Sequence, residues 1–225
     1  MLPVVLALAL AACVGDDGRT GSQPTPAPTV APTFAADQTA VPADGVTGAA
    51  YEGGLIGSGT TAASMDDPRP APPLVGLVKA DASPFDLADL AGHPALVFFG
   101  YTHCPDVCPT TIGTLFEVLA EHPEARAVFV SVDPERDTPE FLAGWTEYFP
   151  EAFIGVTGSP GAIRRAADAY GVKYARVETS SRAGYTMSHT ANVFLIDGDG
   201  QLRGSYPFGT GPDAFIADLS RLPDG

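Results

Sequence analysis

Two cysteines stand four residues apart, Cys104 and Cys108, in the segment from Tyr101 to Pro109 (YTHCPDVCP). A cysteine thiolate is both a nucleophile and a ligand for soft metal ions. A pair at this spacing can therefore bind a metal together, or form and break a disulfide in a redox reaction. The third cysteine of the chain, Cys13, lies far away near the N-terminus. Cys104 and Cys108 therefore act as the chemical pair.

The pair lies between a predicted strand and a predicted helix. Residues 95–100 form an apolar run typical of a buried strand, and residues 110–120 place their apolar side chains on one helical face. If the first helical turn begins by Cys104, both sulfurs lie on the same face of the helix. Pro105 favours that start, because its fixed φ suits a first turn. A helix N-terminus also lowers the pKa of a thiol, so the sequence predicts a reactive pair at this junction.

Downstream of Pro72, segments typical of strands alternate with segments typical of helices. We predict a small hairpin at the start and another near the end, with helices that begin at a serine or threonine followed by proline. The predicted strands cover 74–79, 85–87, 96–101, 127–132, 153–156, 172–177, 191–196 and 201–206, and the predicted helices cover 110–120, 138–149, 159–170 and 212–222. This order predicts an α/β three-layer sandwich.

The first 13 residues form an apolar run that is too short to span a bilayer and is typical of a signal peptide. The run ends in Leu10-Ala11-Ala12-Cys13, which resembles the lipobox of bacterial lipoproteins, whose cysteine becomes the lipidated N-terminus. A plain secretory signal with an incidental cysteine is the alternative. We therefore expect a protein on the extracytoplasmic face of a bacterial membrane, anchored by a lipid on Cys13.

Residues 14–71 are rich in Gly, Pro, Ala, Thr and Ser and contain few large apolar side chains. Such a composition buries too little surface to offset the entropy of ordering the chain, so we predict a disordered linker before a folded domain at 72–225. The whole chain carries 12 Lys+Arg against 27 Asp+Glu, a net charge of −15. This charge argues against nucleic acid as a partner.

Three motifs resemble the Sco/SenC family, and they occur in the same order as in that family: Phe98 to Pro109, Val130 to Pro139 (VSVDPERDTP), and Ser188-His189-Thr190 before an apolar strand. The resemblance covers about residues 72–222. It implies a thioredoxin-like fold, to which the N-terminal hairpin is an extension. Members of this family are membrane-tethered copper chaperones for the binuclear copper site of cytochrome c oxidase subunit II. The resemblance therefore implies a copper-delivery function for this chain.

In the Sco/SenC family the two cysteines and the later histidine bind copper, which implies Cys104, Cys108 and His189 as the metal ligands here. Thiolates favour Cu(I) and an imidazole nitrogen helps to hold Cu(II), so this donor set suits one copper ion per chain in either state. Taken alone, His189 is better explained as an ordinary exposed or hydrogen-bonded histidine, and it is the family context that favours a ligand role.

Three further residues are candidates to support these ligands. His103 adjoins Cys104, but neighbours in sequence point away from each other, so a supporting role is favoured over a ligand role. Met187 shares the side of His189 if the segment is extended, and packing is its alternative role. Asp133 follows a predicted strand, from which it could orient a ligand or cap a turn.

The alternative function is a thiol–disulfide oxidoreductase. Such an enzyme would use the same two cysteines to reduce cysteines of the same client protein or of another. The C-x3-C spacing differs from the C-x2-C of redox motifs. Thioredoxins also carry a proline facing their cysteines, whereas residues 185–191 contain none and place a histidine there. The two functions are compatible, because a chaperone can reduce its client before metallating it. A copper or redox sensor is a third possibility.

Overall fold

The computed structural model describes residues 67–180 and 184–223. The predicted signal peptide, its Cys13, and the predicted linker up to residue 66 lie outside the described residues. Within the described ranges, no helix is long and apolar enough to cross a membrane.

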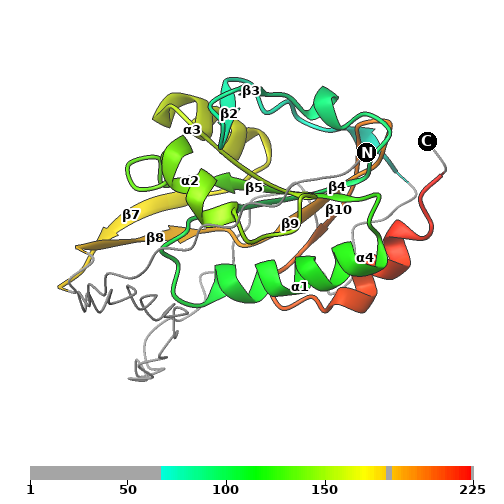
Figure 1. Ribbon diagram of the computed structural model, residues 1–225. Helices are drawn as coiled ribbons and strands as arrows, with labels where there is room; N and C mark the ends of the chain where they lie inside the picture. The colour runs from blue at the N-terminus through cyan, green and yellow to red at the C-terminus, as the bar shows by residue number, and fades with distance from the viewer. Residues whose placement is uncertain (1–66, 181–183, 224–225) are drawn as a thin grey trace, which may run out of the picture. The chain divides into compact units, whose positions relative to one another are not determined.

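An eight-stranded mixed sheet forms the centre of the domain, with strand order β1-β10-β9-β4-β5-β6-β2-β3 (Figure 1). The middle strands β4, β5 and β6 are parallel, and β9 runs antiparallel beside β4. All six residues of β4 are buried, as its unbroken apolar sequence predicts. The strands are β1 (Arg69–Pro70), β2 (Leu77–Lys79), β3 (Pro84–Phe85), β4 (Ala95–Gly100), β5 (Arg126–Ser131), β6 (Phe153–Gly158), β9 (Val193–Ile196) and β10 (Gln201–Tyr206).

Helices cover both faces of this sheet. α1 (Val107–Glu121) and α4 (Pro212–Leu219) pack together on one face, and α2 (Pro139–Thr146) and α3 (Pro160–Ala169) lie on the other (Figure 1). The apolar side chains of both layers meet on the central strands, where Phe98, Phe99 and Phe129 are almost fully buried. This arrangement confirms the predicted α/β three-layer sandwich.

The two helices on that second face begin as their sequences predict. The side chain of Thr138 accepts a hydrogen bond from the Phe141 amide, and the side chain of Ser159 accepts one from the Ala162 amide. A proline follows each cap at the first helical position, where its missing N–H costs no hydrogen bond. After α3, Gly171 has a φ of +70°, which glycine adopts readily at the residue after a helix.

A second, two-stranded sheet consists of β7 (Tyr174–Glu178) and β8 (Tyr185–His189). The sequence predicts a strand near β7 but not β8. No residue of this ribbon is fully buried. The alternation of Tyr185 and Met187 with Thr186 and Ser188 in β8 is a strand signal that the sequence analysis missed. β8 carries His189 at its end, so the missed strand is the one that presents a predicted ligand.

Two other predicted boundaries are wrong. β1 pairs Arg69 with Leu202 of β10, so the sheet begins inside the predicted linker, before the predicted domain start at residue 72. Leu87 belongs to a short 3₁₀ helix, η1 (Leu87–Leu90), rather than to the predicted hairpin strand. The reason is Asp86, whose side chain accepts a hydrogen bond from the Ala88 amide and starts a helical turn.

Candidate metal centre

The two cysteines lie where the chain leaves β4 and enters α1. Cys108 is the second residue of α1, whereas Cys104 lies in the turn before it, where its amide donates to the Tyr101 carbonyl at 3.2 Å. The helix therefore does not begin by Cys104, which was the condition for both sulfurs to lie on one helical face. Residues 101–104 are held in a turn outside the helix, and the first helical hydrogen bond runs from Thr110 to the Asp106 carbonyl.

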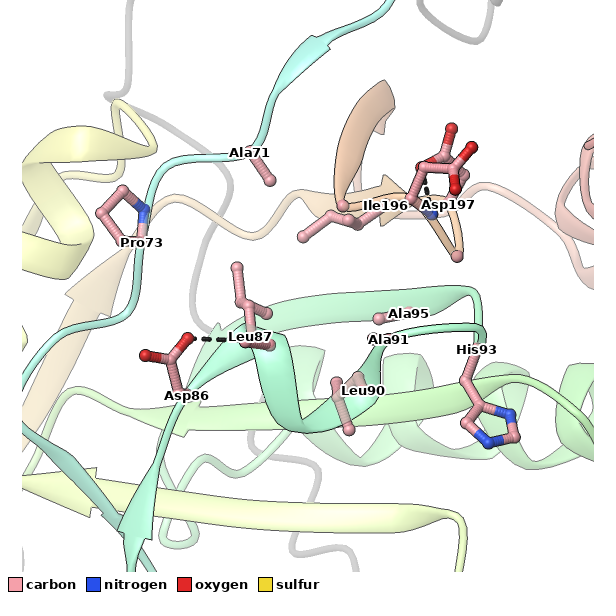
Figure 2. A pocket seen from close by; sticks show the side chains of 14 residues that line it. Ala71, Pro73, Asp86, Leu87, Leu90, Ala91, His93, Ala95, Ile196 and Asp197 are labelled. Atoms are coloured by element: carbon pink, nitrogen blue, oxygen red, sulfur yellow. Dashed lines mark hydrogen bonds between the residues drawn. The ribbon is translucent and has the colours of Figure 1, made fainter. Parts of the chain in front are cut away.

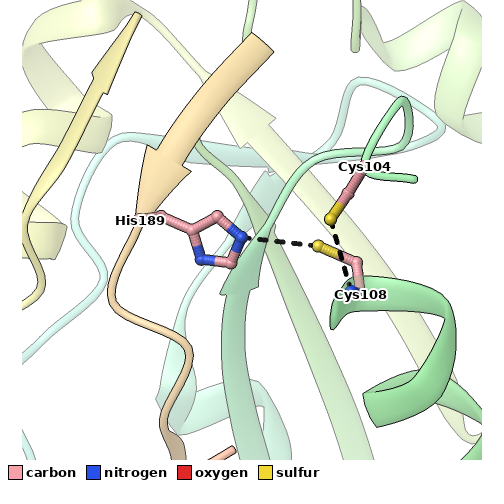
Figure 3. A group of neighbouring side chains, drawn as sticks. All are labelled: Cys104, Cys108 and His189. Carbon is pink, nitrogen blue, oxygen red and sulfur yellow. Dashed lines mark hydrogen bonds between the residues drawn. The ribbon is translucent and has the colours of Figure 1, made fainter. Parts of the chain in front are cut away.

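The turn brings Cys104 over the N-terminus of the helix. The Cys108 amide donates to the Cys104 sulfur at 3.4 Å, so the sulfur receives one of the free amides of the first turn (Figure 3). No disulfide joins the two cysteines, which are 8% and 2% exposed. Their spacing thus brings the sulfurs together as predicted, although through a turn and a helix start rather than through one helical face.

His189 completes the group from the opposite side. Its Nε2 lies 3.5 Å from the Cys108 sulfur, and its Nδ1 lies 3.1 Å from the Thr190 carbonyl oxygen (Figure 3). A carbonyl can only accept, so Nδ1 carries the proton in this hydrogen bond and the Nε2 lone pair faces the sulfurs. The ring packs edge-on against Phe98 and Tyr101, with centroids 6.2 and 5.9 Å away.

The two sulfurs and one histidine nitrogen all lie within 4.8 Å of one another. Among residues 67–180 and 184–223, this is the one group of at least three His, Cys, Asp or Glu side chains that could hold a metal ion. The structure therefore brings together the three residues that the sequence predicts as ligands.

Gly100, the last residue of β4, leaves room for the Cys108 sulfur because it has no side chain. An added Cβ at this position would lie 3.0 Å from the Cys108 sulfur and 2.9 Å from the rings of Phe98 and Phe129. Any larger residue would displace one of these three groups. The close packing of β4 against the first turn of α1 therefore depends on a glycine here.

The two thiols have opposite acidities. The Cys108 thiol hydrogen-bonds to the Cys104 sulfur and lowers the pKa of Cys104 to about 3, against the opposing effect of burial. The same hydrogen bond, together with burial, raises the pKa of the Cys108 thiol. At neutral pH the metal-free pair therefore shares one thiolate and one proton, and metal binding releases that remaining proton.

We expect the thiolate absorbance of the reduced, metal-free protein to stay at one thiolate per pair as the pH falls from 8 to 5. It should decrease only as the pH approaches the Cys104 pKa of about 3. An unfolded thiol has a pKa of about 8.5, so the chain takes up a proton on unfolding at any pH between about 3 and about 8.5. The free energy of unfolding therefore rises with pH between these two values. Ultraviolet titration of a Cys13→Ser variant measures the pair alone. A thiolate signal that appears only above about pH 8 would contradict this coupling.

The three candidate supporting residues make different contacts in the structure. His103 stacks on Phe141 at 5.5 Å between ring centroids and contacts the Thr102 hydroxyl at 2.9 Å, so it lies outside the three-donor group. Met187 packs against the hydrophobic core. Asp133 accepts a hydrogen bond from the Tyr185 hydroxyl at 2.8 Å, and Tyr185 begins the strand that ends at His189.

Asp137 is a supporting residue that the sequence analysis missed. Its buried carboxylate accepts hydrogen bonds from the Thr102 amide at 3.0 Å, the Thr102 hydroxyl at 2.6 Å and the Ser131 hydroxyl at 2.6 Å. Burial raises the pKa of Asp137. These bonds fix the turn that presents Cys104. The one sequence signal for Asp137 was its place in the second family motif. Its contact with Thr102 spans 35 residues of sequence, so no local spacing pattern indicates it.

A separate pocket of about 500 Å³ lies between η1 and the turn that joins β9 to β10 (Figure 2). Its lining includes Ala95 at the start of β4, whereas the cysteine turn follows the end of that strand. Leu87, Leu90 and Asp197 also line it, and it contains no cysteine. This pocket is therefore not part of the metal centre.

Comparison with known proteins decides the family. The SCO1/SenC family model matches residues 75–224, which is most of the chain and includes all three donors. The chain belongs to the SCO1/SenC family. The thioredoxin-like fold and the family resemblance predicted from the sequence are thus confirmed.

Solved SCO1/SenC structures resemble this domain. The copper-bound ScoI of Bradyrhizobium japonicum is 36% identical, with a TM-score of 0.61, over 69% of this chain and 100% of that one. The apo Sco1 of Thermus thermophilus is 31% identical, with a TM-score of 0.59, over 73% of this chain and 100% of that one.

Curated SCO1/SenC relatives match over shorter spans. A protein of Stutzerimonas stutzeri whose name describes it as copper-binding is 34% identical over 137 residues, 59% of this chain and 67% of that protein. The SCO2-like protein of Rickettsia felis is 35% identical over 130 residues, 56% of this chain. The match spans 63% of the Rickettsia protein's own length, less than two thirds.

The donors of this SCO1/SenC site fit copper. Two thiolates suit Cu(I), and the additional imidazole supplies the nitrogen that Cu(II) prefers. A structural zinc site would take a fourth protein ligand, and the group holds three. The chemistry of the donor set therefore agrees with the predicted cofactor.

Proposed function

We propose that this SCO1/SenC protein binds one copper ion through Cys104, Cys108 and His189 and delivers it to the binuclear copper site of cytochrome c oxidase subunit II. The observation that carries the proposal is the convergence of the three donor atoms within 4.8 Å. The copper-bound Bradyrhizobium relative and the name of the Stutzerimonas relative support copper as the metal. The oxidase as client rests on the family resemblance.

The placement of the ligands suits a protein that must release its metal. Cys104 lies in a turn and His189 at the end of the two-stranded sheet, so neither belongs to the central sheet or to a helix. Cys108 alone is fixed in a long helix. A client ligand can therefore replace Cys104 and His189 one at a time, while Cys108 keeps its position in α1.

The second candidate function is thiol–disulfide exchange, and the acidity of Cys104 favours it. A thiolate with a pKa of about 3 next to a protonated partner can attack a disulfide and be resolved by that partner. A very low pKa also weakens a nucleophile, so the thiolate gains population but loses intrinsic reactivity. His189 at 3.5 Å from the Cys108 sulfur is better explained as a metal ligand.

Copper transfer separates the two functions. The copper-loaded protein is mixed with the reduced, copper-free soluble domain of cytochrome c oxidase subunit II, and the visible spectrum of the binuclear site is followed. We expect the spectrum to appear with the native protein and to be absent with Cys108→Ser. Fast disulfide exchange by the metal-free protein, unaffected by His189→Ala and without copper transfer, would favour the oxidoreductase function over copper delivery.

We also propose that a lipid on Cys13 anchors the protein to the extracytoplasmic face of a bacterial membrane. The support is the lipobox-like sequence before Cys13, which lies outside the described residues. Cys13→Ser should release the protein from the membrane fraction or leave its precursor uncleaved, with copper binding unchanged. Mass spectrometry of the native N-terminus checks this prediction. An unlipidated chain that begins at another residue would rule out the anchor.

A further inference from the structure

We infer that Asp133, Arg136 and Tyr185 form a latch that positions His189 for the metal, and this inference rests on the proposed copper site. These are positioning residues, because none of them belongs to the three-donor group. Their contacts join the β5–α2 loop to the start of the strand that carries the histidine. We call this set of three residues the hairpin latch.

The need for a latch follows from the topology. Cys108 is held in position by α1, and Gly100, which packs against it, belongs to β4 in the centre of the main sheet. His189, in contrast, lies on the separate two-stranded sheet. β8 pairs only with β7, which is itself mostly exposed. An isolated ribbon of two strands is marginally stable in water. Contacts other than strand pairing must therefore hold His189 against the cysteines.

Tyr185 is held on both sides of its ring and at its hydroxyl. The guanidinium carbons of Arg136 and Arg176 each lie 3.7 Å from its ring centroid, a cation–π arrangement on an aromatic ring. Its hydroxyl donates to the Asp133 carboxylate at 2.8 Å, and that carboxylate is buried. Arg176 is held in turn by Glu135, at 2.8 Å. The first residue of β8 is thus fixed in position and direction.

Arg136 connects the latch to the metal centre by two routes. Its Nη1 donates to the Tyr185 carbonyl at 3.1 Å, and its Nε donates to the Asp133 carboxylate. Its guanidinium also lies 5.7 Å from the ring of Tyr101, which packs edge-on against the His189 imidazole. The Arg136 side chain is 17% exposed. One partly buried cation therefore contacts both the strand and the aromatic wall that hold the histidine.

The strand geometry carries this constraint to the ligand. Side chains two residues apart point to the same face of a strand, so Tyr185 and His189 share one side of β8. Thr186, between them, is also tied to the body of the domain, because its hydroxyl lies 2.7 Å from that of Tyr101. Loosening Tyr185 should therefore let the imidazole move away from the sulfurs without removing any donor atom.

The inference is tested with Tyr185→Phe, which keeps the ring and removes the hydroxyl bond to Asp133. Copper affinity of the full chain is measured for both oxidation states by competition with chelators. A hydrogen bond to a charged group supports an effect of about tenfold, so we expect about tenfold weaker Cu(II) binding. The Cu(I) affinity should change less than about twofold, because two thiolates suffice for Cu(I).

The matched control is Tyr174→Phe, on the other strand of the same ribbon. Tyr174 has Arg164 3.8 Å from its ring centroid, as Tyr185 has its arginines, but its hydroxyl has no hydrogen bond within the described part of the chain. Tyr174→Phe should leave both copper affinities unchanged. Equal Cu(II) losses in the two variants would show a general loosening of the ribbon and would overturn the latch.

A double-mutant cycle separates positioning from general stability. With His189→Ala already present, adding Tyr185→Phe should cause no further loss of Cu(II) affinity, because there is no imidazole left to position. Additive losses would overturn the inference. In copper-free protein, amide exchange over residues 185–189 should be faster in Tyr185→Phe and in Arg136→Lys than in the native chain. Unchanged exchange and unchanged Cu(II) affinity in both variants would also overturn it. If the native chain fails to bind copper at all, the proposed function fails instead.

Discussion

Oxidising Cys104 and Cys108 to a disulfide should abolish tight copper binding. Copper is held by deprotonated thiolates, and a disulfide removes both of them at once. Each lost ligand costs a few kcal/mol, so the copper affinity should fall by more than about a thousandfold. The sulfurs already lie within 4.8 Å of each other, and the pair can therefore close with a small movement of the turn at Cys104.

This measurement is made on a Cys13→Ser variant, so that the pair contains the only thiols in the chain. Copper retained against a chelator is compared for reduced, oxidised and re-reduced protein. We expect full binding, no tight binding and restored binding, in that order. If the disulfide form binds copper as tightly as the reduced form, the assignment of both sulfurs as ligands is wrong.

His189→Ala should separate the two oxidation states of the metal. Cu(I) is held adequately by two thiolates, whereas Cu(II) prefers a site with nitrogen donors and loses one here. We expect Cu(II) affinity to fall by about tenfold to a thousandfold and Cu(I) affinity to fall much less. Competition titrations measure both, with the thiolate-to-Cu(II) charge-transfer band as the spectroscopic check.

Cys104→Ser and Cys108→Ser are the controls for His189→Ala, and each should weaken both oxidation states. Equal losses for Cu(I) and Cu(II) in His189→Ala would show that the histidine is structural. No loss for either ion would place the third ligand elsewhere, and Met187, Asp133 and His103 would then be tested in turn.

The sequence predicts the central layers of the fold because their signals are local. β4 is a continuous apolar run, β5 contains one at residues 127–130, and the caps at Thr138 and Ser159 act on amides three residues away. Such features depend on neighbours in the chain, so composition and spacing reveal them. The same holds for the hairpin of β9 and β10, whose turn at Asp197–Gly200 separates two strands of the main sheet.

The parts that the sequence analysis missed depend on distant contacts or on a lack of burial. β8 is half-buried rather than buried, and its alternation of apolar and polar residues spans only five positions. The start of α1 is delayed by a turn at Cys104, and that turn is held by Asp137, whose bonds reach back to Thr102. The three residues of the donor group were nevertheless predicted together, because the family resemblance supplied His189, which spacing alone could not connect to the cysteines.

X-ray absorption of the copper-loaded, reduced protein tests the central claim most directly, since it counts the atoms bound to the metal. It is combined with metal analysis of the same sample. The account predicts one copper per chain with two sulfur donors, and an imidazole signal that disappears in His189→Ala. A site with fewer than two sulfurs, or an imidazole signal that persists in His189→Ala, would contradict it.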